Sequence, residues 1–183
     1  LIHKSWALFF SKYIAAYERE GVPIWGLTAQ NEPAFNAPWE ACTWSAEEQR
    51  DFLRDYLGPR IRADFPDLKI MIWDHNRDLI YNWTKVVMSD PIAASFVDGV
   101  SFHWYGPGNG PGFMWYEELD KTHDSYPEAF LIMGEGTICP GVALGDWTRG
   151  EAYAHDILED LNHWSVGFVD WNPLPRDRNL GIF

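Results

Sequence analysis

Two glutamates, Glu32 and Glu135, are the residues whose type and setting most clearly suggest chemistry. Each follows a short apolar segment that is predicted to be a buried strand, so each would project from a rigid strand end. Hydrolysis of a glycosidic bond with retention of configuration needs two carboxyl groups roughly 5 Å apart. One attacks the anomeric carbon, and the other must be protonated, which repulsion between close carboxylates favours. The alternative is that each glutamate simply begins a loop or a helix.

Polar neighbours strengthen the interpretation of the two glutamates as a catalytic pair. Asn31 could donate its side-chain amide to a sugar hydroxyl, and Pro33 restricts the turn that follows. Tyr105 could donate a hydrogen bond to a carboxylate nucleophile and keep it ionised. His103 could do the same, or it could be a histidine of the hydrophobic core.

Aromatic side chains are unusually frequent, at 16% of the residues with eleven tryptophans. They can pack a core, or their flat faces can bind sugar rings. Trp104 and Trp171 are candidate sugar platforms, and packing is the alternative for both.

Five short apolar segments are predicted to be the strands that position these residues. Their nearly continuous hydrophobicity is typical of parallel strands that are buried on both faces. The predicted strands are Val22–Thr28, Lys69–Trp73, Val97–Phe102, Phe130–Met133 and Val166–Val169.

Helical patterns separate the predicted strands, and this alternation indicates the α/β class. An aromatic stripe at helical spacing predicts the first helix, and the capping box Ser45–Glu48 predicts the start of another. The stripe consists of Trp6, Phe9, Phe10, Tyr13 and Tyr17. Further helices are predicted near Asp78–Met88, Phe113–Asp124 and Thr148–His163, and a loop at Gly106–Gly112.

Every predicted strand ends in side chains that can ionise, hydrogen-bond or stack. In order, these are 31–32, 74–76, 103–105, 135 and 170–172. In a closed parallel barrel all these ends meet on one face, where active sites of this architecture lie. A doubly wound sheet would concentrate its chemistry at one switch point. The even distribution therefore favours a (β/α)8 barrel.

Other classes of function fit the sequence less well. The net charge of −13, without a run of Lys or Arg, argues against a nucleic-acid partner. No HExxH motif, phosphate-binding loop or GxSxG motif occurs, and the histidines lack metal-ligand spacing, so no metal site is expected. The glycines of the Gly106–Gly112 loop do not fit the dinucleotide-binding fingerprint. Whether Cys42 and Cys139 form a disulfide cannot be deduced from the sequence.

The segment Gly26–Pro33, which reads GLTAQNEP, resembles the Asn-Glu-Pro acid/base segment of clan A glycoside hydrolases. Within that clan the chain is similar to glycoside hydrolase family 30, which includes glucosylceramidases. The similarity covers nearly the whole chain in order. It continues through Glu47–Pro59, Ile70–Arg77, Trp83–Pro91, Ser101–Tyr105, Gly134–Gly136, Gly145–Gly150 and Val169–Asn172.

The resemblance implies a (β/α)8 TIM barrel, of which this chain would hold roughly strands four to eight. It implies Glu32 as the acid/base, Glu135 as the nucleophile and Tyr105 as the residue that supports the nucleophile. The substrate-binding residues implied are Asn31, Asp74, His103, Tyr105, Trp171 and Asn172. No cofactor is expected.

The resemblance also implies that residues 1–183 are one catalytic domain without the family's first three strands and accessory β-sandwich. A partial barrel would have two open edges and would be poorly stable alone. The expected activity is hydrolysis of glucosylceramide to glucose and ceramide, with contact to a lipid surface and a lysosomal or secreted location. The alternatives are a related β-1,6-glucanase or xylanase, and an inactive or carbohydrate-binding fragment.

Overall fold

The computed structural model of the protein describes residues 2–106, 111–138 and 143–171. The chain divides into two compact units. The first comprises Leu1–Asp74 and Asn82–Val100, and the second comprises His75–Tyr81 and Ser101–Phe183. The predicted loop Gly106–Gly112 lies partly outside the described residues. Of the two cysteines, Cys42 is exposed and Cys139 lies outside the described residues.

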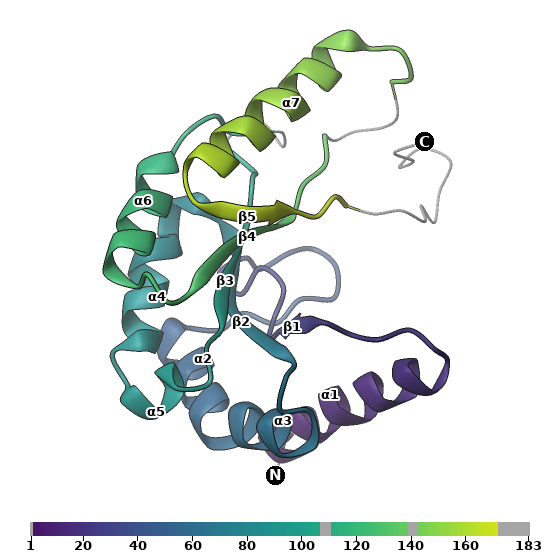
Figure 1. The fold of residues 1–183 in the computed structure, drawn as a ribbon, viewed down its shortest axis with the longest axis vertical. Coiled ribbons are helices and arrows are strands. Elements are labelled where there is room, and N and C mark those ends of the chain that lie inside the picture. Colours follow the sequence, from purple (N-terminus) through teal and green to yellow (C-terminus); the bar gives the residue numbers. More distant parts are fainter. Residues whose placement is uncertain (1, 107–110, 139–142, 172–183) are drawn as a thin grey trace. The chain divides into compact units, whose positions relative to one another are not determined.

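Five strands form a sheet in which they follow one another in chain order (Figure 1). The strands are β1 (Gly26–Thr28), β2 (Lys69–Asn76), β3 (Gly99–His103), β4 (Phe130–Glu135) and β5 (Ser165–Phe168). β1 pairs in parallel with β2, and β4 pairs in parallel with β5. All five predicted strands are present, and helices separate them as the sequence predicts.

The helices include all those that the sequence predicts, together with shorter ones that it does not. They are α1 (Ile2–Arg19), α2 (Ala46–Phe52), α3 (Gly58–Asp64), α4 (Ile80–Met88), α5 (Pro91–Ala94), α6 (Tyr116–Ser125) and α7 (Trp147–Asn162). A π-helical turn, Leu53–Leu57, joins α2 to α3, and a 3-10 turn, Arg77–Leu79, precedes α4. Within the described residues, no helix has the length and apolar character that a membrane span requires.

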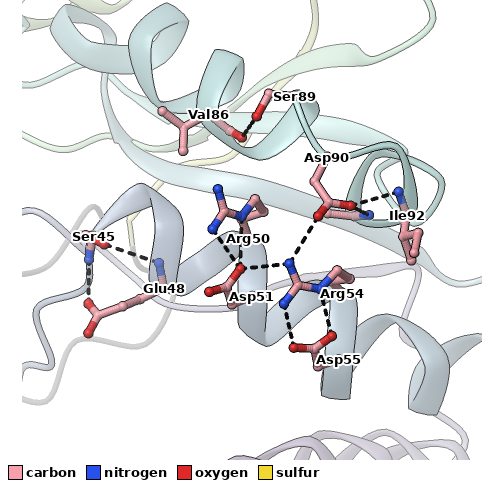
Figure 2. Close-up of polar contacts among 11 residues, drawn as sticks. Ser45, Glu48, Arg50, Asp51, Arg54, Asp55, Val86, Ser89, Asp90 and Ile92 are labelled. Carbon is pink, nitrogen blue, oxygen red and sulfur yellow. Dashed lines mark hydrogen bonds and ion pairs between the residues drawn. The ribbon is translucent and has the colours of Figure 1, made fainter.

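The start of α2 is set by the capping box that the sequence predicts (Figure 2). The Ser45 hydroxyl accepts a hydrogen bond from the Glu48 backbone N–H at 3.2 Å, and the Glu48 carboxylate accepts one from the Ser45 N–H at 2.8 Å. These two bonds satisfy backbone donors that helix geometry leaves unpaired. Farther along, Arg54 pairs with Asp55 and also with Asp90, which caps α5, so the ion pairs tie this segment to α5.

The aromatic stripe of α1 is not the face that this helix buries in the described structure. Ala7, Ser11 and Ile14 are its buried residues, and the Ser11 hydroxyl donates a hydrogen bond to the Asp64 carboxylate at the end of α3. Four stripe residues are at least 40% exposed: Trp6, Phe9, Tyr13 and Tyr17. The helix therefore has a small buried face against α3 and a separate aromatic face.

The strand β1 is shorter than the predicted segment Val22–Thr28, whose first residue is bonded elsewhere: the Val22 N–H donates to the Tyr17 carbonyl oxygen of α1 at 3.0 Å. Pro23 has no backbone N–H and cannot donate to a strand ladder, which accounts for the late start at Gly26. Here the backbones pack closely: a Cβ atom on Gly26 would lie 3.1 Å from Lys69 Cβ. A short, tightly paired β1 thus carries the segment that leads to Glu32.

Buried apolar side chains of the strands form the cores of the two units. Ile70, Ile72 and Trp73 of β2 are at most 1% exposed in the first unit, and Leu131 and Met133 of β4 are equally buried in the second. Buried residues follow one another along β2 and β3, as expected of strands covered on both faces. These rigid strands hold the backbone from which the candidate site residues project.

Candidate active site

Glu32 lies in the first unit, four residues after the end of β1, and is half-buried. Its backbone N–H donates a 2.9 Å hydrogen bond to the Asp74 carbonyl oxygen. The Thr28 hydroxyl, at the end of β1, donates to the Asp74 carboxylate. Asp74, which is only 9% exposed, therefore ties the Glu32 segment to β2. Asn31 is exposed beside Glu32.

The backbone around Glu32 and Asp74 adopts an uncommon conformation. Glu32, Trp73 and Asp74 have φ values of 44°, 72° and 69°, in the left-handed region that costs roughly 1–3 kcal/mol for a residue other than glycine. Buried Gln49 supports this bend, because its Oε1 accepts the Trp73 N–H at 3.1 Å and the Trp83 indole N–H at 2.7 Å. No local sequence pattern points to Gln49, because its two partners lie more than twenty residues away.

Glu135 lies in the second unit, where it is the last residue of β4, with a side chain that is 16% exposed. The Tyr105 hydroxyl donates a hydrogen bond to Glu135 Oε1 at 3.1 Å. His103 Nδ1 lies 3.9 Å from the same oxygen, and the His103 side chain is fully buried. The carboxylate thus has a phenol donor and an imidazole beside the same oxygen, and the hydrogen bond from the phenol favours its ionised form.

Trp104 packs in the core of the second unit and is not a sugar platform. Only 1% of it is exposed. Because consecutive residues of an extended chain point to opposite sides, Trp104 points away from His103 and Tyr105. Its indole N–H donates to the Thr137 carbonyl oxygen at 3.2 Å. A Cβ atom on Gly136 would lie 2.9 Å from the indole, so this glycine allows the close approach.

Trp171 follows β5 and keeps about half of its surface exposed, at 49%. Its backbone N–H lies 3.0 Å from the Gly136 carbonyl oxygen and 3.0 Å from Asp170 Oδ1. The backbone of the predicted platform is therefore hydrogen-bonded to Gly136, the residue that follows Glu135. Asn172, the other substrate-binding candidate at this end, lies outside the described residues.

Two further residues of this region, Tyr153 and Asp170, were not predicted to have a role. The Tyr153 hydroxyl, on α7, donates a hydrogen bond to Asp170 Oδ1 at 3.2 Å. Burial raises the pKa of the Asp170 carboxyl, and its hydrogen bonds from Tyr153 and Trp171 counteract this only in part. Asp170 is among the polar residues at the ends of strands, which is the one signal that could have singled it out.

A buried ionic cluster anchors α7 within the second unit. The Arg77 guanidinium donates to Asp156 at 2.7 Å and to Asp160 at 2.6 Å, and all three side chains are almost wholly buried. The Tyr116 hydroxyl also donates to Asp156, at 2.8 Å. Burial raises the pKa of Asp160 to about 8, although Arg77 opposes the shift. One guanidinium thus faces two buried carboxyl groups.

The structure gathers the predicted residues into two groups, one in each unit. Within the first unit Glu32 is bonded to Asp74 and adjoins Asn31. In the second unit Tyr105 and His103 lie beside Glu135. The Trp171 N–H is hydrogen-bonded to the carbonyl oxygen of the next residue, Gly136. Both groups follow the carboxyl ends of strands, where the active sites of parallel α/β barrels lie.

The sequence model of the glycosyl hydrolase family 30 TIM-barrel domain matches residues 1–178. The chain belongs to glycosyl hydrolase family 30. Membership in family 30 confirms the predicted resemblance and the fold class: the sheet with its helices is part of a TIM barrel.

The chain is similar to proteins named as glucosylceramidases and to one named as an endo-β1,6-glucanase. The chain is 37% identical to "Putative glucosylceramidase 3" of Caenorhabditis elegans, covering 93% of this chain and 34% of that protein. It is 35% identical to the "Lysosomal acid glucosylceramidase" of Mus musculus, covering 94% and 35%. The structure of "The endo-beta1,6-glucanase BT3312" superposes with a TM-score of 0.81 at 30% identity, covering 98% of this chain and 39% of that one. The chain spans about a third of the length of the curated relatives it matches.

Proposed function

We propose that the protein is a retaining β-glycosidase in which Glu135 is the nucleophile and Glu32 is the acid/base. The observation that carries this proposal is the hydrogen bond from Tyr105 to the Glu135 carboxylate at the end of a barrel strand. A carboxylate must be ionised to attack an anomeric carbon, and a phenol donor favours that form. Residues 1–183 then belong to one catalytic domain, whose barrel the chain contains in part.

In the first step, Glu135 Oε attacks the anomeric carbon and the bond to the leaving oxygen breaks. Glu32 donates its proton to that oxygen, so the aglycone departs as a neutral alcohol and Glu32 becomes a carboxylate. The sugar is now esterified to Glu135. The Tyr105 hydroxyl, 3.1 Å from Glu135 Oε1, and His103 Nδ1, 3.9 Å from it, flank the carboxylate in this step.

In the second step, water replaces Glu135 on the anomeric carbon. The Glu32 carboxylate removes a proton from that water, which restores both glutamates and gives a product of the original configuration. The bond from the Glu32 N–H to the Asp74 carbonyl oxygen fixes the backbone that must serve both steps. Asn31, Trp171 and Asn172 bind the sugar, with the Trp171 indole as its platform.

The substrate that we favour is glucosylceramide, which gives glucose and ceramide. Two observations support it: the names of the nematode and mouse relatives, and exposed aromatic residues in the segment after Glu32. Phe35 and Trp39 are 42% and 63% exposed and contact each other edge to face. An apolar surface beside the acid/base suits a lipid aglycone, because the acid/base faces the leaving group. The protein would then contact a lipid surface in a lysosomal or secreted setting.

A second candidate substrate is β-1,6-glucan. The likeness to the endo-β1,6-glucanase BT3312, at 30% identity and nearly full coverage of this chain, supports it. Xylan is a third candidate and belongs, like β-1,6-glucan, to the class of β-glycans. The two candidate classes share the sugar-binding and catalytic residues and differ in what lies on the aglycone side.

The test uses the longest natural polypeptide that contains these residues, with Glu32→Gln and Glu135→Gln variants. Each change should lower kcat for a β-glucoside by at least about 10²–10⁴-fold, because each removes a step that the other residue cannot perform. A dinitrophenyl glucoside needs no acid for departure, so Glu32→Gln should still release its phenol in a burst and Glu135→Gln should not. Azide should rescue Glu32→Gln with retention of configuration. Activity that survives in both variants would refute the assignment.

The choice of substrate needs a parallel comparison of wild-type rates. Glucosylceramide in mixed micelles, β-1,6-glucan and xylan would be assayed with the same preparation, with Glu135→Gln as the blank. We expect glucosylceramide to give the highest kcat/KM. Faster hydrolysis of β-1,6-glucan would assign the second candidate, and binding without hydrolysis of any substrate would make the protein a carbohydrate-binding one.

A further inference from the structure

We infer that Tyr153 is a positioning residue that, through Asp170, holds Trp171 in place as the sugar platform. The inference rests on the proposed function, because it concerns how that site holds its sugar. Tyr153 lies on α7 rather than at a strand end, and its hydroxyl contacts the site through the Asp170 side chain.

The contacts form a continuous path from the helix to the platform. The Tyr153 hydroxyl donates to Asp170 Oδ1 at 3.2 Å, and the same oxygen accepts the Trp171 N–H at 3.0 Å. That N–H is shared with the Gly136 carbonyl oxygen, also at 3.0 Å. Asp170 and Gly136 therefore hold one backbone donor from two sides, and Gly136 is the residue next to Glu135.

The Tyr153 ring is itself held in a defined place. It packs against Trp104 with ring centroids 4.6 Å apart and against Phe168 of β5 at 6.2 Å. Trp104 is buried, so this support is rigid. The position of the Tyr153 hydroxyl is consequently set by packing of its ring. Through its hydrogen bond the hydroxyl then orients the Asp170 carboxylate.

The expected consequence concerns substrate binding more than bond cleavage. Trp171 is 49% exposed, so packing holds its indole only in part and its orientation depends on how well its backbone is fixed. Without the Tyr153 hydroxyl, Asp170 Oδ1 loses its phenol donor and keeps the Trp171 N–H. The Glu135 contacts with Tyr105 and His103 are separate from this path and stay intact.

The test is a set of steady-state measurements on the longest natural polypeptide that contains these residues. Tyr153→Phe keeps the ring and removes only the hydroxyl, so KM for a β-glucoside should rise about 3- to 10-fold while kcat changes less than about 3-fold. Asp170→Leu should raise KM as much or more. Asp170→Asn keeps an acceptor oxygen for both donors, so it should raise KM less than Asp170→Leu does.

Tyr116→Phe is the matched control, since it removes a phenol bond to a different aspartate, Asp156, which lies on α7. We expect it to lower the melting temperature and leave KM unchanged. An unchanged KM in Tyr153→Phe, or in Trp171→Leu, would overturn the positioning role. A wild-type protein without glycosidase activity, or an active Glu135→Gln variant, would instead refute the proposed function, so the two failures are distinguishable.

Discussion

Tyr105 and Glu135 are joined by a 3.1 Å hydrogen bond between side chains thirty residues apart, one just after β3 and one at the end of β4. Replacing one side chain by another that lacks a single oxygen atom is enough to remove this bond. Tyr105→Phe keeps the aromatic ring and deletes the donor to the carboxylate. A hydrogen bond to a charged group contributes about 1.5–3 kcal/mol, so kcat/KM for a β-glucoside should fall roughly 10- to 100-fold. Exposed Tyr17→Phe on α1 is the control, and equal rates in Tyr105→Phe and wild type would exclude a role for the phenol.

Gly136 should tolerate no side chain, because the residue after Glu135 lies directly against Trp104. A Cβ atom there would be 2.6 Å from Met133 Cε and 2.9 Å from the indole. Gly136→Ala should therefore destabilise the protein by about 1–3 kcal/mol and displace Glu135, which lowers kcat as well. Denaturant unfolding and steady-state kinetics would measure the two effects.

The matched control for Gly136→Ala is Gly150→Ala, in α7, where an added Cβ atom meets nothing within 4 Å. That change should be neutral or stabilising by up to about 1 kcal/mol, because alanine favours helix more than glycine does. Trp104→Phe provides space, so the double variant Trp104→Phe/Gly136→Ala should lose less than the sum of the single losses. Additive losses would show that the glycine and the indole do not constrain each other.

Gln49 should be essential for the bend that precedes Asp74. Its Oε1 accepts the Trp73 N–H and the Trp83 indole N–H, and Gln49 and Trp73 are fully buried. Gln49→Met keeps the size and deletes the acceptor, which should cost about 1–3 kcal/mol for each buried donor left unpaired. Because Asp74 holds the Glu32 backbone, kcat should fall too. A free energy of unfolding within about 0.5 kcal/mol of wild type would contradict this account.

Stability should depend on pH through Asp160. Burial raises its pKa from an ordinary 3.8 to about 8. The folded state therefore keeps a proton that the unfolded chain releases above about pH 4. This contribution to stability is complete below pH 4, and it declines by at most about 1.4 kcal/mol per pH unit as the pH rises to about 8. Thermal unfolding of Asp160→Asn should lack that decline, whereas Asp67→Asn, at an exposed carboxylate, should keep it. The same slope in Asp160→Asn and wild type would assign the pH dependence to another group.

The sequence predicts the elements well because their signals are local. The capping box at Ser45 and Glu48 places a helix start to the residue, and continuous apolar runs identify the five strands. Local errors have local causes, such as Pro23, which delays β1. The pattern of polar residues at strand ends makes Glu32 and Glu135 candidates, because parallel strands present their ends together, and their catalytic roles stay a prediction.

Local sequence patterns do not predict which distant segments contact each other. Gln49 bonds to residues more than twenty positions away, and Arg77 to aspartates about eighty positions away. For Trp104, residue type allowed both a platform and a core position, and packing against Gly136 decides for the core. The exposed aromatic face of α1 is another case, since the periodicity shows that a stripe exists and not what it contacts.

The most direct test of the central claim is to trap the sugar on the nucleophile. A 2-deoxy-2-fluoro-β-glucoside with an activated leaving group forms its glycosyl ester far faster than water can hydrolyse it. Peptide mass spectrometry after reaction with the longest natural polypeptide that contains these residues should locate the fluoroglucosyl group on Glu135. A label on Glu32, on Asp74 or on any other residue, or an active enzyme that is never labelled, would contradict the assignment of Glu135 as nucleophile.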